Sequence, residues 1–139
     1  MSLAKSFFIL LFILHIGNIY PAIAGNYNSV RYEVHIVSAL PNDDIPLWYH
    51  CASKDDEFGT HMLKVGEEFH FRFIQNLWES TLFFCHFWWG EKQNAFDVFS
   101  NSLTKLCSKS SLRTCYWKVQ SDGFYAGPKL DQLNLMHGW

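Results

Sequence analysis

The sequence predicts a small all-β protein, an antiparallel β-sandwich stabilised by two disulfides. From Val30 onward, apolar residues alternate with polar ones along most of the chain, which is the period of a β-strand. Turn-forming residues separate these runs at short intervals, as is typical of sandwiches and barrels. Four cysteines follow the first 24 residues. An even number of cysteines in a chain of this size indicates a disulfide framework.

The N-terminal segment has the three parts of a secretory signal peptide. Lys5 supplies a positive charge, Phe7–Leu14 is an unbroken apolar run, and Ala22–Ala24 has the small-x-small pattern of a cleavage site. The run is shorter than the roughly 20 apolar residues that span a bilayer. We therefore expect cleavage of residues 1–24 and a secreted, extracellular single domain, residues 25–139, without membrane insertion. An uncleaved anchor and a buried core helix are the alternatives.

The first two predicted strands alternate cleanly and are separated by a polar turn. Residues 30–36 alternate apolar side chains with charged residues or histidine. Residues 41–44 form a turn, since proline, asparagine and aspartate favour turn conformations. Residues 47–51 resume the alternation. The polar stretch 53–57, which ends at Gly59, is a second connection.

The middle of the chain contributes the most apolar strand. Residues 69–73 place three phenylalanines on one face, and a polar connection begins at residues 75–76. Residues 81–89 are apolar on both faces. Such a strand is either central and covered on both sides, or it presents an aromatic outer surface. Residues 90–94 then turn the chain, and Phe96 begins the next strand.

The C-terminal part begins with a predicted hairpin. Residues 115–120 alternate, Ser121–Gly123 turns because Asp-Gly readily adopts positive φ angles, and residues 124–126 return. Residues 127–139 contain leucines among polar residues and form either one short helical turn or a loose tail. The chain has 13 Phe, 6 Trp and 6 Tyr, most of them expected in the core. Six lie on clean inward faces: Phe69, Phe71, Phe73, Phe83, Phe87 and Trp117.

The four cysteines are Cys51, Cys85, Cys107 and Cys115, and four cysteines admit three pairings. We favour Cys51–Cys115 and Cys85–Cys107. Cys51 and Cys115 lie on apolar strand faces, whereas Cys107 lies in a polar connection that can reach Cys85. The cysteines lack the short Cys-x-x-Cys spacing of structural zinc sites. We therefore expect no metal site and no cofactor.

The sequence contains no catalytic constellation, and we expect a protein that is not an enzyme. His50 and His86 each adjoin a cysteine, but adjacent strand residues point to opposite faces and cannot form a nucleophile–base pair. His61 and His70 could meet carboxylates in space, although no spacing requires it. A nucleophile elbow, a phosphate-binding loop and a His-Glu-x-x-His helix are all absent from the sequence.

The charge distribution does not suggest nucleic-acid binding. The formal net charge is −2, and nucleic-acid binding needs a concentrated positive field. The sharpest cluster is Asp55, Asp56 and Glu57. Three contiguous acids lack the alternating ligand positions of an EF-hand loop. We interpret them as a solvated loop that caps its own turns, with calcium binding as the weaker alternative.

Four motifs in a constant order indicate a family. They are HCASKDDEFG (His50–Gly59), LKVGEEFHFRF (Leu63–Phe73), TLFFCHFWW (Thr81–Trp89) and CYWKVQSDGFY (Cys115–Tyr125). Together they resemble the plant self-incompatibility S-protein family, whose many members are called S-protein homologues. The resemblance covers residues 34–125 and includes all four cysteines.

This resemblance implies a small, secreted, disulfide-bonded β-sandwich. Founding members of the family act as female-side signals in the stigma, where they bind a receptor on incompatible pollen and trigger calcium-linked growth arrest. The implied function is that of an extracellular signalling ligand for a cell-surface receptor protein, and we expect a monomer. Fold and export transfer within a family more readily than pollen rejection does. Ser38, Glu57–Phe58 and a tail from Gly127 to Trp139 depart from the family's pattern.

The expected recognition residues lie on three polar segments, because sandwiches present binding loops on rigid sheets. Ordinary solvated turns are the alternative for each segment. Two other functions stay open: a secreted defence protein or inhibitor, and a cell-wall carbohydrate-binding module that stacks Trp48, Trp88 or Tyr116 on sugar rings. The candidate receptor-binding residues are Asn42, Asp43, Asp44, Lys54, Asp55, Asp56, Glu57, Glu91, Lys92, Gln93 and Asn94.

Overall fold

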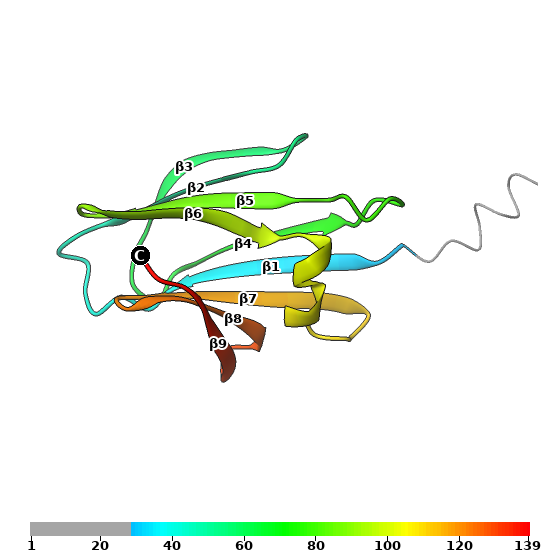
Figure 1. Cartoon of the computed structure of the whole chain (residues 1–139). Helices are drawn as coiled ribbons and strands as arrows, with labels where there is room; N and C mark the ends of the chain where they lie inside the picture. Colours follow the sequence, from blue (N-terminus) through cyan, green and yellow to red (C-terminus); the bar gives the residue numbers. More distant parts are fainter. Residues whose placement is uncertain (1–28) are drawn as a thin grey trace, which may run out of the picture.

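A computed structural model describes residues 29–139 as two β-sheets packed face to face (Figure 1). One sheet has five strands in the order β4-β1-β7-β8-β9, and the other has four in the order β3-β2-β5-β6. The prediction of an all-β sandwich with two disulfides is confirmed. The predicted signal peptide, residues 1–24, lies outside the described residues.

The strands and one short 3-10 helix, η1, follow the chain in a simple order. Within the described part of the chain, no helix is long and apolar enough to cross a membrane. The elements are β1 (Arg31–Ser38), β2 (Leu47–Ala52), β3 (Glu57–Leu63), β4 (Glu68–Ile74), β5 (Phe83–Trp89), β6 (Lys92–Phe99), η1 (Asn101–Leu106), β7 (Leu112–Gln120), β8 (Gly123–Lys129) and β9 (Gln132–His137).

The core lies between the sheets. It is built from every second residue of each strand, the one that points inward, as the period-two pattern predicts. Of the six aromatic residues expected inside, four are buried: Phe71, Phe83, Phe87 and Trp117. Phe69 and Phe73 are half-buried and pack against the core, because β4 lies at the edge of its sheet. Burial of these large apolar side chains is the main favourable contribution to folding.

One strand pair departs from the antiparallel arrangement. β1 pairs with β4 in the antiparallel sense but with β7 in the parallel sense. A parallel pair needs a long crossover connection, and here the crossover includes β2 to β6 and η1. The chain therefore returns to the end at which β1 begins, and β7 runs beside β1 in the same direction (Figure 1).

Before the C-terminal tail, two elements were missed and the start of β6 was placed too late in the sequence-based prediction. β3 was not predicted because it is an edge strand on which only Leu63 is buried, so its residues do not alternate. η1 was also missed, since it has no buried residue. β6 begins at Lys92, inside the segment predicted as a turn. A strand can resume so early because Gly90 has a φ of 61° and completes a tight turn.

The C-terminal residues form a strand, so the predicted helical turn or loose tail is wrong. β8 continues to Lys129 and β9 forms the edge of the five-stranded sheet. Register shifts between the two strands interrupt the alternation that would have revealed β9. A Cβ on Gly127 would lie 2.0 Å from the Gln132 carbonyl oxygen, so only glycine allows this approach. Trp139 then donates a hydrogen bond from Nε1 to the Gln120 carbonyl (2.9 Å).

The disulfide pairing differs from the predicted one. Cys51 pairs with Cys85, and Cys107 pairs with Cys115. Cys51 and Cys85 stand directly opposite each other on β2 and β5, with Cα atoms 4.1 Å apart. The predicted Cys51–Cys115 bond would join two different sheets. The apolar faces of these residues were predicted correctly, but the register that brings Cys85 beside Cys51 cannot be inferred from alternation alone.

Candidate functional site

The three predicted recognition segments do not form one surface. Residues 42–44 precede β2, and the turn containing Glu91 follows β5, so both lie at the same end of the four-stranded sheet, where Leu47 pairs with Trp89. Residues 54–56 follow β2 and lie at the opposite end (Figure 1).

The segment 42–44 stabilises its own end of the sandwich. The Asn42 side-chain carbonyl accepts a hydrogen bond from the Asp44 N–H (3.0 Å), which is the bond of an Asx turn. The Asp43 carboxylate accepts one from the Val65 N–H (2.8 Å), across to the connection between β3 and β4. Asn42 and Asp43 thus have structural roles, although all three side chains are exposed.

The segment 91–94 is mostly strand, so its prediction as a loop is wrong beyond Glu91. Residues 92–94 pair with β5 across the hairpin. Gln93 hydrogen-bonds to the His86 ring (2.9 Å), and the Asn94 side chain donates to the Gly138 carbonyl (2.7 Å). Only Glu91 stands in the turn itself, where it is exposed.

The connection between β2 and β3 is held together by the motif residues around Glu57. The Ser53 hydroxyl accepts a hydrogen bond from the Asp56 N–H (3.0 Å), and the Ser53 N–H donates to the Asp56 carbonyl (2.8 Å). The Glu57 carboxylate accepts from the Gly59 N–H (2.9 Å) and contacts the His50 ring (2.5 Å). The His-Cys-x-Ser and acidic motifs therefore stabilise this hairpin. Lys54 and Asp55 lie at its tip, where both are exposed.

These contacts predict that the pKa of the Glu57 carboxyl is lower in the folded protein than in a model peptide. The hydrogen bond from the Gly59 N–H, followed by that from His50, lowers the pKa of Glu57 below its ordinary value. Because the folded pKa is the lower one, Glu57 stabilises the fold above its unfolded pKa of about 4.3. That contribution is lost as the pH falls through the folded pKa. NMR titration should place its midpoint below that of a model peptide. A midpoint at or above the peptide's value would contradict the geometry, and His50→Ala should remove only the smaller part of the shift.

The connection between β4 and β5, not predicted as a recognition segment, is an ordered loop organised by Asn76. The Asn76 N–H donates to the Thr81 hydroxyl (2.9 Å), and its side chain donates to the Ser80 hydroxyl and accepts from the Ser80 N–H (2.8 Å each). The Glu79 N–H donates to the Asn76 carbonyl (3.1 Å), and Glu79 adopts a φ of 53°. A non-glycine residue in this region is uncommon, and the surrounding bonds hold it there.

This loop presents large apolar side chains to solvent. Trp78 is 87% exposed and Leu77 is 65% exposed, while Ile74 and Leu82 flank them at 56% and 42%. Clustered exposed apolar side chains are typical of interaction sites, and tryptophan is enriched among the residues that dominate binding energy. In the sequence, the indication of this surface is Leu77 and Trp78, two large apolar residues directly after the polar residues 75–76. Only the start of a connection was predicted there.

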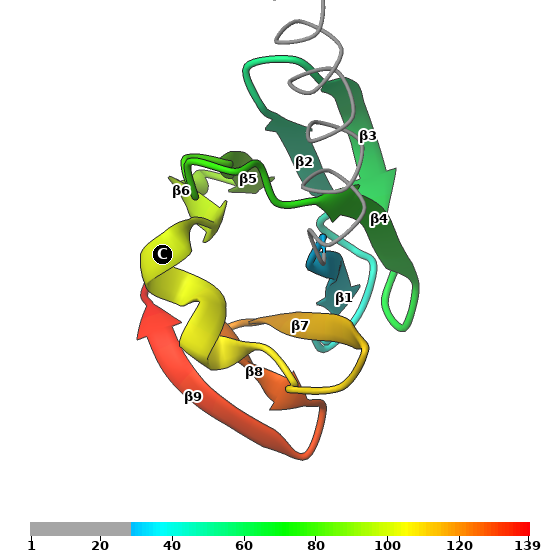
Figure 2. The ribbon, with the colours of Figure 1, turned by 90° about the vertical axis from the view of Figure 1, so that its right-hand side faces the viewer.

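The tips of the two connections share one end of the sandwich (Figure 2). A hollow of about 290 Å³ between them is lined by Lys54, Asp55 and Asp56 on one side and by Asn76 and Leu82 on the other. We call five of the exposed residues at this end the Trp78 surface, namely Lys54, Asp55, Leu77, Trp78 and Leu82. Of the predicted recognition residues, Lys54 and Asp55 therefore belong to it.

The outer side of the four-stranded sheet carries a second exposed apolar surface. Trp48, Met62 and Phe84 are 42%, 45% and 38% exposed, and Trp48 lies opposite both Met62 and Trp88. β5 thus presents an aromatic outer surface, one of the two arrangements that its sequence allowed. Trp88 is half-buried, with its ring 3.8 Å from that of His86. We call Trp48, Met62, Phe84 and Trp88 the aromatic face.

The fold and these surfaces define a class of protein, a small disulfide-bonded β-sandwich with ordered, exposed loops. The family model described as plant self-incompatibility protein S1 matches residues 33–139. The chain belongs to this family. Because the match extends to the last residue, the tail from Gly127 to Trp139 is part of the family's domain. The expectation that the tail extends beyond that domain was wrong.

Individual relatives agree with this assignment. S-protein homolog 2 of Arabidopsis thaliana is 33% identical over 115 residues, which cover 81% of this chain and 71% of that protein. S-protein homolog 5 of the same species is 39% identical over 79 residues, 56% of this chain, and the match spans only 58% of its length.

A solved structure shows the same fold with a TM-score of 0.61. It is 18% identical and covers 80% of this chain and 96% of its own. It belongs to the SPH (self-incompatibility protein homologue) proteins, described as "a widespread family of small, highly stable, secreted proteins from plants".

Proposed function

We propose that this protein is a secreted ligand recognised by a cell-surface receptor protein through the Trp78 surface. Family membership and the secreted solved relative support export, as does the signal-peptide pattern in residues 1–24. The observation that carries the proposal is an ordered loop that holds Trp78 87% exposed. Rejection of pollen, the role of the family's founding members, is the narrower form of the same proposal.

Exposing Trp78 to water is unfavourable, and burying it against a partner costs little conformational entropy. An indole buries roughly 150–250 Å² when it enters a pocket, and the Trp78 side chain makes nearly all of its surface available. The Asn76 hydrogen bonds already order the loop. Binding therefore loses less conformational entropy than it would with a mobile loop. Lys54 and Asp55 at the rim would orient the partner more than they would strengthen binding.

Binding of labelled protein to intact plant cells, pollen included, tests this proposal. We expect saturable binding that unlabelled protein competes away and that surface proteolysis of the cells abolishes. Trp78→Ala should weaken binding about 30-fold, the equivalent of about 2 kcal/mol for a dominant interface residue. Trp48→Ala is the matched control, since it removes an exposed tryptophan from the aromatic face. Non-saturable binding, or equal affinity of the Trp78→Ala variant, would overturn the proposal.

Binding of cell-wall polysaccharide is a second candidate, supported by the aromatic face. Trp48 and Trp88 lie directly opposite each other on neighbouring strands, and tryptophans on the outer side of a sheet can stack on sugar rings. Tyr116, also considered for this role, lies on the other sheet with its ring 4.9 Å from that of His35. Polysaccharide pull-down that Trp48→Ala removes and Trp78→Ala preserves would favour this function.

A further inference from the structure

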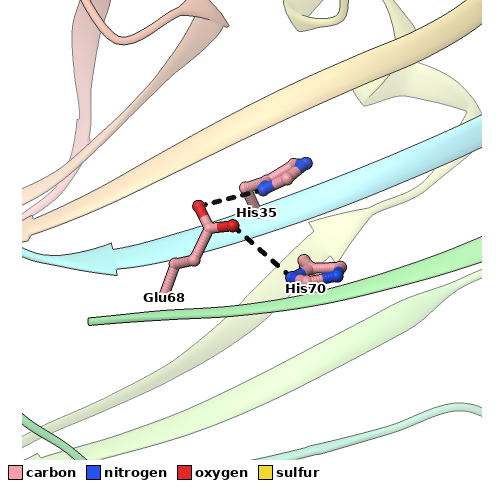
Figure 3. Close-up of side chains that lie close together, drawn as sticks. All are labelled: His35, Glu68 and His70. Carbon is pink, nitrogen blue, oxygen red and sulfur yellow. Dashed lines mark hydrogen bonds and ion pairs between the residues drawn. The ribbon is translucent and has the colours of Figure 1, made fainter.

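Two histidines and a glutamate converge on the outer side of the five-stranded sheet (Figure 3). His35 lies on β1, directly opposite His70 on β4. Glu68 precedes His70 by two residues and therefore lies on the same face. The Glu68 carboxylate lies 3.1 Å from His35 Nδ1 and 3.5 Å from His70 Nδ1. One donor atom from each residue lies within 4.8 Å of the other two, the only such group of three among residues 29–139.

The His35 ring is held in one orientation. Its Nε2 atom hydrogen-bonds to the Glu33 carboxylate, which also accepts a hydrogen bond from Arg72. The Tyr116 ring packs 4.9 Å from the imidazole, and only 12% of the His35 side chain is exposed. A proton on Nε2 leaves the Nδ1 lone pair directed at Glu68. Metal-binding histidines are commonly oriented in this way, by a carboxylate on the second ring nitrogen.

The three side chains would share a cation well when each histidine carries its proton on Nε2. When both histidines are neutral and their Nδ1 atoms carry lone pairs, these atoms and the Glu68 oxygens are all electron-pair donors that face one another. Protons or a metal ion relieve the repulsion. Two imidazole nitrogens and one carboxylate form a donor set suited to Zn²⁺, Cu²⁺ or Ni²⁺, whereas Ca²⁺ and Mg²⁺ prefer oxygen ligands alone.

We propose that His35, Glu68 and His70 bind a divalent transition-metal ion of the zinc class. His35 Nδ1, His70 Nδ1 and the Glu68 carboxylate would be the three protein ligands, and water or a donor from a partner molecule would complete the tetrahedron. Ligand bonds of about 2.0–2.2 Å bring donor atoms to roughly 3.5 Å from one another. The Glu68 and His70 side chains are 42% and 54% exposed, so they can rotate toward the ordered His35 ring.

Calorimetric titration with ZnCl2 tests this proposal. The protein should be exported by a eukaryotic host, without a polyhistidine tag, and stripped of metal with a chelator. We expect one zinc ion per chain. His70→Ala and Glu68→Gln should each weaken binding at least 10-fold, since each removes one of three ligands. Glu33→Gln should weaken it about 10- to 100-fold, the usual effect of losing the carboxylate that orients a metal-binding histidine.

His50→Ala is the matched control, because His50 and Glu57 form another histidine–carboxylate pair but with only two donors. This variant should keep the wild-type affinity. Zinc should also raise the unfolding temperature of the wild type, because a ligand that binds only the folded state stabilises it. It should do so much less for His70→Ala, whose replaced side chain is more than half exposed and outside the core. No binding, or binding that His70→Ala and Glu68→Gln leave unchanged, would overturn the proposal.

Discussion

Replacing Cys51 and Cys85 together with alanine should lower the free energy of unfolding by about 4 kcal/mol. Replacing Cys107 and Cys115 should lower it by only about 2.5 kcal/mol. The difference arises because the two bonds close loops of different length. The Cys51–Cys85 bond has a sequence separation of 34 residues, and the Cys107–Cys115 bond has a separation of 8. A longer closed loop removes more conformational entropy from the unfolded chain. All four cysteines are buried, so the loss of packing is similar in the two variants.

Urea unfolding of the two double variants measures this difference. Proteolytic mapping of the oxidised wild type provides the control, since it should yield one disulfide-linked fragment that joins Cys107 to Cys115 and another that joins Cys51 to Cys85. Equal losses of stability would contradict the loop-length argument. Recovery of a Cys51–Cys115 peptide would contradict the pairing itself.

Trp117→Ala should destabilise the fold by about 3–5 kcal/mol, the usual cost of deleting a large buried aromatic side chain. Trp117 is 2% exposed, and its ring lies 5.2 Å from that of Phe96, on the opposite sheet. Its Nε1 atom donates a hydrogen bond to the Val98 carbonyl (2.9 Å). The residue therefore joins the two sheets both by packing and by a buried hydrogen bond.

Two further variants separate these contributions in the same denaturation experiment. Trp117→Phe keeps an aromatic ring but leaves the Val98 carbonyl without its donor, which should cost about 1–3 kcal/mol. Trp78→Ala is the surface control and should change stability by less than about 0.5 kcal/mol, since Trp78 is 87% exposed. A small loss for Trp117→Ala, or an equally large loss for Trp78→Ala, would contradict the described core.

The sequence predicted which residues lie in connections between strands, but not which of them share a surface. Polar composition located the connections around Asn42, Lys54 and Glu91, but it could not show that the first and third lie at one end and the second at the other. It also could not separate Lys54 at an exposed tip from Glu57, whose carboxylate accepts a hydrogen bond within the hairpin. In the sequence, Trp78 cannot be distinguished from an aromatic residue of the core, because exposure is a property of the folded chain.

The cluster of His35, Glu68 and His70 could not be predicted from the sequence either. The sequence predicted no metal site because the cysteine spacing excludes structural zinc and no histidine motif is present. His35 and His70 come together only because β1 and β4 pair in one particular register. Alternation places both histidines on the outward faces of their strands, but it does not determine that these two strands pair, or that the register sets one histidine directly opposite the other.

Properties that depend on neighbouring residues could be predicted from the amino-acid sequence. Period-two alternation gives the all-β class and the inward position of Trp117, and the ordered motifs around the cysteines identify the family. Three features became evident only from the folded chain: the parallel pairing of β1 with β7, the Cys51–Cys85 bond and the strand formed by the tail. Each depends on the register between segments far apart in the chain, which is set by packing of the whole core and not by any local pattern.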